Sequence, residues 1–128
     1  MQKSTFAALA SAFAALALPA AAIAQDPLSM YPENYRVLLE NDRVRVLDFR
    51  LARGAREQMH THPAHLAVFL EEFTIRFTLP DGSHPLREGR PHQVSWSDGV
   101  THASENIGTS DAHGILVELK ELACGAAQ

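Results

Sequence analysis

The sequence predicts an all-β fold, built as a sandwich or barrel in a single domain. Its apolar segments are short, turn residues separate them, and no segment has the pattern of a long helix. The stretch 73–79 carries an apolar residue at every second position, which is the period of a half-buried strand. Several short strands at such spacing are typical of sandwiches and barrels. The chain shows no internal repeat and no low-complexity stretch, so we expect one domain.

The expected strands follow one another with turns between them. Asn41-Asp42 supplies the first turn, because both residue types favour turn conformations. Gly54 and Gly99 are expected at positions of positive φ, which glycine adopts without steric cost. Pro63 leaves open whether the third strand runs unbroken. The expected strands lie at 35–39, 44–51, 60–70, 73–79, 93–97, 101–107 and 114–122.

Residues 1–24 have the pattern of a secretory signal peptide. Lys3 precedes an apolar run at 6–18, and the small-residue ending Ala22-Ile-Ala24 follows it. A membrane anchor is the alternative, but the run is rich in alanine and shorter than the roughly 20 residues that span a bilayer. We therefore expect cleavage before Gln25, a periplasmic or secreted protein, and no membrane contact after removal of the signal.

Removal of the signal would leave 104 of the 128 residues, enough for one hydrophobic core. We expect a Pro-containing leader at 25–34, the β-rich domain at 35–122 and a tail at 123–128. The only cysteine, Cys124, falls on this tail, and we assign it no catalytic role.

The charge of the chain argues against nucleic acid as a partner. The formal net charge is −4, and removal of residues 1–24 takes away one basic side chain, Lys3, and no acidic one, which gives −5. A nucleic-acid binder needs a cationic surface to displace counterions from phosphates, and the sequence shows no basic stripe. A small molecule is the expected partner.

Three histidines outline a metal site. His60 and His62 stand one residue apart, and alternate side chains of a strand lie on one face, so both imidazoles can reach one cation. His102 would complete the set. Gln58 shares their parity and could hydrogen-bond a bound water, and a solvated position is the equal alternative. Neutral imidazole suits zinc, copper, iron and nickel, and three protein ligands leave coordination positions open. The expected cofactor is a divalent transition metal: iron, zinc, manganese, nickel or copper.

The residues around these histidines resemble the two sequence motifs of the cupin family, small jelly-roll β-barrels that often bind a metal inside the barrel. The similarity extends from Arg36 to Glu121, most of what would be the mature protein. It implies a single-domain cupin-type jelly-roll β-barrel over 35–122. Because cupins commonly pair through outer strands, it also implies a homodimer. The matching motif residues are Gly54, His60 and His62 for the first motif, and Gly99, His102 and Asn106 for the second.

The chain departs from the cupin motifs at three places. Leu66 and Ala67 replace the glutamate ligand that usually follows the second histidine. Ser97 stands where a proline is usual, and His92 where a glycine usually opens the second motif. The resemblance places position 67 inside the barrel, and strand alternation would bring His65 inward with it. His65 is therefore a candidate fourth ligand, and a surface or supporting histidine near the barrel mouth is the alternative.

We expect no ligand role for the remaining histidines or for Trp96. We expect His84, His92 and His113 to be solvated loop residues, because each lies beside a turn or at the start of a strand. Trp96 is expected in the core or in a pocket wall, where its indole nitrogen would need a hydrogen-bond partner.

Two functions from different classes fit these observations. The three-histidine centre resembles those of cupin dioxygenases, so an exported metal-dependent oxidoreductase is one expectation. A non-catalytic periplasmic module that binds or senses a small molecule is the other. The sequence offers no clear general acid, base or nucleophile beside the ligands. That absence disfavours hydrolysis and sugar isomerisation more than oxygen chemistry, where the metal carries the reaction.

Overall fold

The protein is described by a computed structural model over residues 25–121. The predicted signal peptide (1–24) and tail (123–128) lie outside the described residues. Within residues 25–121 the chain forms one short helix and nine strands. Their bounds are α1 Pro27–Met30, β1 Tyr35–Glu40, β2 Val44–Leu51, β3 Arg56–His62, β4 His65–Phe69, β5 Phe73–Thr78, β6 Leu86–Gly89, β7 Val94–Ser97, β8 Val100–Asn106 and β9 Ala112–Leu119.

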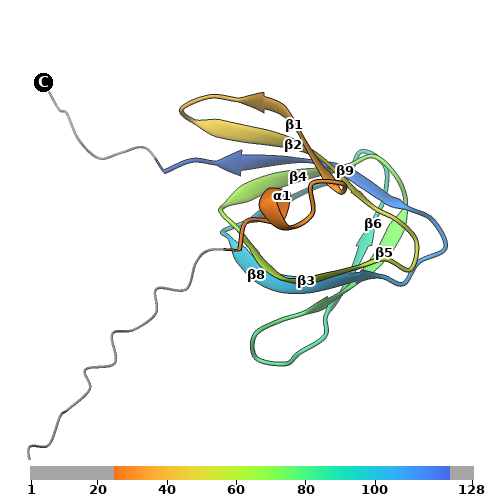
Figure 1. The fold of residues 1–128 in the computed structure, drawn as a ribbon. Coiled ribbons are helices and arrows are strands. Elements are labelled where there is room, and N and C mark those ends of the chain that lie inside the picture. The colour runs from red at the N-terminus through yellow and green to blue at the C-terminus, as the bar shows by residue number, and fades with distance from the viewer. Residues whose placement is uncertain (1–24, 122–128) are drawn as a thin grey trace, which may run out of the picture.

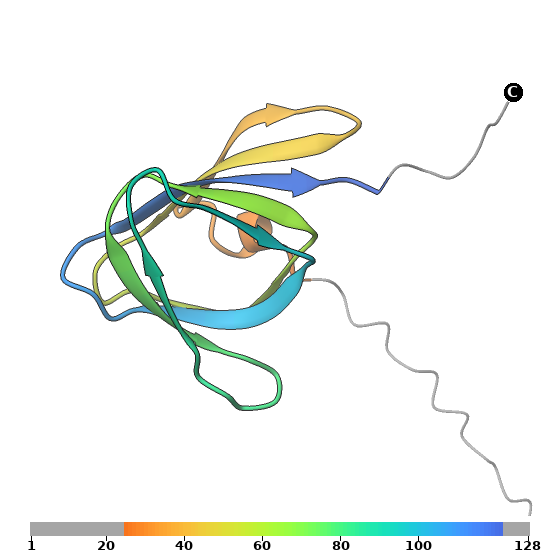
Figure 2. The same ribbon diagram turned by 180° about the vertical axis from the view of Figure 1, so that it is seen from behind.

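The strands form two antiparallel sheets that face each other as a barrel. One sheet has the order β1-β2-β9-β4-β7, and the other has the order β3-β8-β5-β6. Figure 1 shows β3 and β8 along one wall and the five-stranded sheet along the opposite wall. Figure 2 shows the same two walls from behind. The all-β barrel predicted from the sequence is confirmed.

Most strands lie close to their predicted bounds, and β2 coincides with the expected 44–51. Two elements were not expected. In β6 the first three residues are exposed, and its sequence Leu-Arg-Glu-Gly has no apolar alternation that could indicate a strand. The four-residue helix α1 lies within the predicted leader and is shorter than a helical apolar pattern can indicate.

The segment expected as one strand at 60–70 is two strands in different sheets. β3 ends at His62 in the four-stranded sheet, and β4 begins at His65 in the five-stranded sheet. Pro63 has no amide hydrogen to continue a ladder, and the chain crosses between the sheets at this point. Despite the crossing, His62 and His65 both line the interior of the barrel.

A β-bulge at Gln58 and Met59 changes which side chains of β3 face the interior. The ladder pairs Glu57 with Ser104 and His60 with His102, so a step of three residues along β3 matches a step of two along β8. Glu57 and His60 are therefore both buried, whereas Gln58 is exposed. The expectation that Gln58 shares the face of the histidines is wrong, because regular alternation does not hold across a bulge.

Left-handed backbone occurs at four positions among residues 25–121: Gly54, Gly82, His92 and Gly99. Gly54 and Gly99 have φ values of 76° and 113°, as predicted for turn glycines. His92 has φ 68° and is the non-glycine residue with positive φ among residues 25–121. This is the position where the motif comparison expects a glycine, so His92 occupies a glycine conformation with a larger side chain.

The leader lies across one end of the barrel, where Figure 1 shows α1. The backbone oxygen of Gln25 accepts a hydrogen bond from the amide of Thr61 (2.9 Å), and Asp26 pairs with Arg45 at 2.6 Å. Tyr31 places its ring 6.0 Å from that of His60, between centroids. The leader therefore covers the end of the interior at which the histidines lie. Among residues 25–121 no helix has the length and apolarity to cross a membrane.

Candidate metal centre

The three predicted ligands meet inside the barrel. β3 positions His60 and His62 on its inner face, and the ladder sets His102 of β8 directly opposite His60. All three are buried, and one ring nitrogen from each lies within 4.8 Å of the others. Ring centroids are 5.0 Å apart for His60 and His62 and 4.8 Å apart for His60 and His102. Such a cluster could hold a metal ion.

Hydrogen bonds orient two of these imidazoles. His60 Nδ1 lies 2.8 Å from the carbonyl oxygen of Gln58. A carbonyl only accepts, so Nδ1 carries the proton and Nε2 keeps a free lone pair. Within the described residues, His60 Nε2 is a buried nitrogen without any hydrogen-bond partner. Buried polar atoms are rarely left without a partner, and a metal ion would supply one. The donor set and the unpaired nitrogen therefore fit a bound cation.

The site keeps His60 and His102 neutral. Burial, together with the neighbouring His60, His62 and His65, lowers the pKa of His102 to about 3. Burial also lowers the pKa of His60, which outweighs the opposing effect of the hydrogen bond to Gln58. Neutral imidazole is the form that binds metal, so these two side chains need lose no proton near neutral pH.

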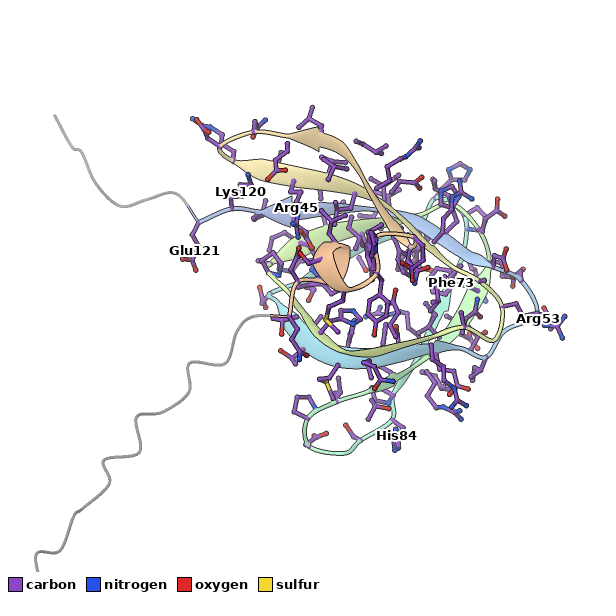
Figure 3. The ribbon with its side chains drawn as sticks, viewed as in Figure 1. Arg45, Arg53, Phe73, His84, Lys120 and Glu121 are labelled. Carbon is purple, nitrogen blue, oxygen red and sulfur yellow. The ribbon has the colours of Figure 1, made fainter. Side chains whose placement is uncertain are left out.

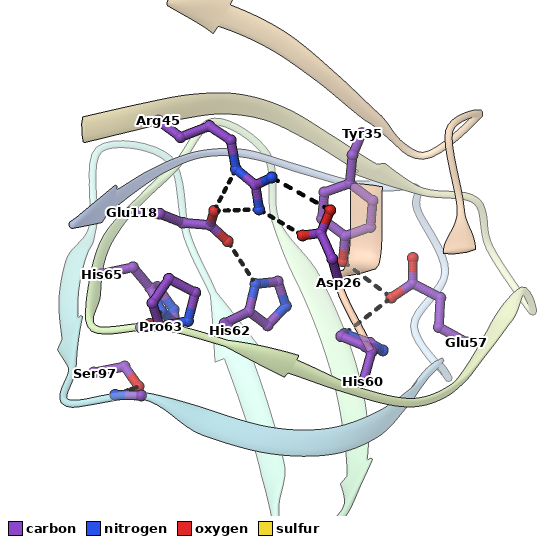
Figure 4. Close-up of polar contacts among 11 residues, drawn as sticks. Asp26, Tyr35, Arg45, Glu57, His60, His62, Pro63, His65, Ser97 and Glu118 are labelled. Carbon is purple, nitrogen blue, oxygen red and sulfur yellow. Dashed lines mark hydrogen bonds and ion pairs between the residues drawn. The ribbon is translucent and has the colours of Figure 1, made fainter. Parts of the chain in front are cut away.

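A chain of ionic contacts supports His62 from outside the cluster. His62 Nδ1 lies 3.0 Å from Glu118 Oε1, and Arg45 Nε donates to Glu118 Oε2 at 2.8 Å (Figure 4). Burial would raise the pKa of Glu118, but the hydrogen bonds from His62 and Arg45 outweigh it and lower the pKa. The carboxylate is therefore ionised, accepts the Nδ1 proton and turns His62 Nε2 toward the cluster.

Glu57 is the main residue of this site that the sequence analysis missed. It is 3% exposed, and its Oε2 lies 3.7 Å from His60 Nε2. The expectation that no acid or base lies beside the ligands is therefore corrected. Glu57 and His60 are three positions apart, and in a regular strand that spacing puts two side chains on opposite faces. Only the bulge brings them together, and the sequence carries no signal for it.

A cavity of about 450 Å³ extends from the histidines through the barrel. This volume falls within the range of small-molecule sites, roughly 300–1,000 Å³. Glu57, His62 and His102 line its polar end, and the ring of Phe77 stacks on His102 with centroids 4.3 Å apart. The rest of the wall is largely apolar and aromatic. Its aromatic members include Phe49, Phe69, Phe73 and Phe77.

No model of a protein family matches the chain, and no curated protein sequence does. Solved structures do match. A cupin domain from Bordetella pertussis Tohama I is 20% identical, with a TM-score of 0.62 over 68% of this chain and 92% of that one. This chain has a cupin fold.

Two further structures support the assignment of the fold. A conserved protein from Klebsiella pneumoniae with a double-stranded β-helix domain is 16% identical, with a TM-score of 0.55 over 71% of this chain and 74% of that one. The polyketide cyclase RemF from Streptomyces resistomycificus is 20% identical, with a TM-score of 0.53 over 68% of this chain and 64% of that one. At these identities the likeness concerns the fold.

In this barrel the residues after Pro63 face inward, as the resemblance to the cupin motifs implies. Ala67 is 5% exposed and lines the cavity, and so does His65. His65 Nδ1 lies 2.8 Å from the carbonyl oxygen of Pro63, and its ring centroid is 5.3 Å from that of His62. Burial lowers its pKa, so it is neutral near pH 7. His65 thus borders the three-histidine cluster but is not a member of the group whose nitrogens converge.

The remaining histidines of the described residues lie away from the cluster. His84 is exposed on the loop between β5 and β6, far from the leader in Figure 3, and His92 is also exposed. His113 differs from its expectation, because it lies within β9 rather than in a loop and its Nε2 is 2.7 Å from Asp48 Oδ1. Trp96 is among the residues that line the cavity, as expected for a pocket wall, but it is 54% exposed on the edge strand β7, and its Nε1 donates to Asp98 at 2.8 Å.

Proposed function

We propose that this cupin binds a divalent transition metal through His60, His62 and His102. The observation that carries the proposal is the buried, unpaired Nε2 of His60, which lies among ring nitrogens that converge within 4.8 Å. Iron, zinc, manganese, nickel and copper are the candidate metals, and imidazole ligands favour zinc, copper, iron and nickel among them.

We further propose that the site binds a small, largely apolar molecule next to the metal and acts as an oxidoreductase of the dioxygenase type. When bound, the metal would supply a Lewis-acidic centre with open positions for substrate and dioxygen. The chain's own residues have supporting tasks. Glu118 fixes the tautomer of His62, Phe77 packs against His102, and the aromatic wall of the cavity excludes water from the reacting molecule.

A non-catalytic binding or sensor module is the alternative function. The wall of the cavity beyond its polar end is largely apolar, which favours binding without proton transfer. Oxygen consumption by the metal-loaded protein with candidate aromatic substrates separates the two functions.

We also propose that the protein acts in the periplasm or outside the cell, because residues 1–24 have the pattern of a signal peptide.

We propose a homodimer because of the outer surface of the barrel. The outer face of the five-stranded sheet carries an apolar row in register across its strands, whereas a sheet face in water normally carries polar side chains. This row, called the apolar outer face below, consists of Leu39, Val46, Val117, Leu66 and Trp96.

Elemental analysis and metal titration test the central proposal. Wild-type protein is expected to bind about one divalent metal ion per chain, and replacement of His60, His62 or His102 by Ala should lower the affinity by about tenfold or more, since even changes outside the ligand set cost 10 to 100-fold. His84→Ala is the matched control and should bind as wild type does. Equal binding by the wild type and the three ligand variants would contradict the site.

A further inference from the structure

Glu57 is a buried carboxylate held by three donors. Its Oε1 accepts a hydrogen bond from Asn34 Nδ2 at 2.7 Å, and its Oε2 accepts from Tyr35 Oη at 3.1 Å and from Ser104 Oγ at 2.9 Å (Figure 4 shows the contact with Tyr35). Burial, together with the adjacent Glu57, raises the pKa of Tyr35 well above its ordinary value, so Tyr35 keeps the proton that it donates. Glu57 therefore accepts hydrogen bonds at both of its oxygens.

This carboxylate has no cationic partner of the kind that Glu118 has. Glu118 lies 2.7 Å from Arg45 Nη2. For Glu57, the only basic side chain within 4.0 Å among residues 25–121 is His60. A buried charge without a counter-charge is costly, and proteins normally pair it or use it to coordinate a metal.

The contact with His60 does not supply that counter-charge by a hydrogen bond. The distance from Glu57 Oε2 to His60 Nε2 is 3.7 Å, longer than a charge-assisted hydrogen bond. His60 donates from its other nitrogen to the Gln58 carbonyl. An imidazole lone pair and a carboxylate oxygen therefore lie side by side without a proton between them, and both attract a cation.

We infer that Glu57 supplies the negative charge of the metal centre, from the strand segment before the histidine pair. This inference rests on the proposed metal site and deepens it, because the position after the pair that would carry a carboxylate holds Ala67 in this chain. The bulge at Gln58 and Met59 allows Glu57 to take the place of the missing glutamate, because it turns Glu57 onto the face of His60.

Glu57→Gln tests the inference, because the amide keeps the size of the side chain and removes its charge. Zinc and cobalt affinity should fall about tenfold or more, and the visible spectrum of the cobalt-loaded variant should differ from that of the wild type. Without metal, the variant should melt at the same temperature as the wild type or higher, since an uncompensated buried charge has been removed. The increase in melting temperature on adding metal should shrink accordingly.

Glu105→Gln is the matched control. Glu105 lies on β8 and pairs with Arg56 and Arg76 on the outside of the barrel, so this change should leave metal affinity unaltered. A second variant, Glu57→Gln with Ala67→Glu, returns a carboxylate to the cavity from β4 and should recover part of the lost affinity. A purely structural role for Glu57 predicts no such recovery.

The outcomes separate the two proposals. If the wild type binds no metal, the metal site itself is wrong and the inference fails with it. If the wild type binds metal and Glu57→Gln binds equally well, the metal site stands and only the inference is wrong. If Glu57→Gln fails to fold without metal, Glu57 is a structural residue and the inference is again wrong.

Discussion

At the scale of single residues, the barrel interior prepares imidazoles in the form that a metal needs. His102 is buried beneath the ring of Phe77, and its neighbours are other histidines rather than carboxylates. Burial and these neighbours act in the same direction and lower its pKa to about 3. In the metal-free protein the lowered pKa of His102 makes the stability depend on pH. Protons bind the unfolded chain in preference to the folded one, so acid favours unfolding.

We expect the metal-free protein to lose stability as the pH falls from about 6.5 to 5. An unfolded histidine binds a proton near pH 6.5, whereas folded His102 stays neutral down to about pH 3. The unfolded state therefore binds more protons in this window, and the free energy of unfolding falls by about 1.5 kcal/mol for this one group. Urea denaturation at both pH values measures it.

His102→Gln removes the titrating group and is the comparison for this experiment. The loss of stability between the two pH values should be smaller in this variant by about the same 1.5 kcal/mol. In His84→Ala the loss should equal that of the wild type, since His84 is exposed. Identical pH dependence in wild type and His102→Gln would mean that His102 is readily protonated in the folded state.

At the scale of the elements, the local sequence pattern predicted most strands. The features that it did not predict depend on how the strands pair with one another. Alternation located β5, a short apolar run after a turn located β2, and two-residue spacing placed His60 and His62 on one face. Neither signal could locate the bulge, because a bulge is a property of the register between β3 and β8 rather than of either sequence. The inward position of Glu57 was hidden for this reason.

The leader is another element that local pattern could not place. Its contacts are with residues distant in sequence: Asp26 pairs with Arg45, and the carbonyl oxygen of Gln25 accepts from the amide of Thr61. Arg45 also contacts Glu118, which orients His62. The leader is thus tied to the same ionic chain that supports one of the proposed ligands.

Asp26→Asn should loosen the leader without unfolding the barrel. The Asp26–Arg45 pair is partly exposed, and such pairs contribute up to about 1 kcal/mol, which corresponds to about a fivefold change in an opening equilibrium. The amide of Thr61 should therefore exchange with solvent deuterium up to about fivefold faster.

The amide of Ile107, which donates to Thr74 at 3.0 Å, serves as the internal reference and should exchange at an unchanged rate. An unchanged rate at Thr61 would show that the leader is held by contacts other than this ion pair. Faster exchange at both amides would instead indicate that the whole barrel has lost stability.

At the scale of the whole molecule, the outer face of the five-stranded sheet carries an apolar row, which is unusual for a sheet face toward water. The inner face lines the cavity. The apolar outer face runs from Leu39 on β1 to Trp96 on β7, and these two end residues are 50% and 54% exposed. A two-fold symmetric dimer buries the same patch of both subunits, so pairing of this face with itself would cover the row.

We expect the wild type to sediment with the mass of two chains, and Leu39→Lys with Trp96→Lys to sediment with the mass of one. Both side chains are half exposed in the single chain, so the double variant should keep its melting temperature at low protein concentration. Sedimentation equilibrium measures the mass. A wild type that remains a single chain at all concentrations tested would contradict the dimer.

The bulge at Gln58 and Met59 also bears on how such chains are compared. A sequence motif written as fixed spacings treats every intervening position as equivalent, and it has no symbol for a strand that shifts by one residue. Glu57 therefore falls among positions that a motif search ignores. A search for chains that lack the later glutamate and carry one three residues before the first histidine would test whether other proteins place a carboxylate ahead of the same pair of imidazoles.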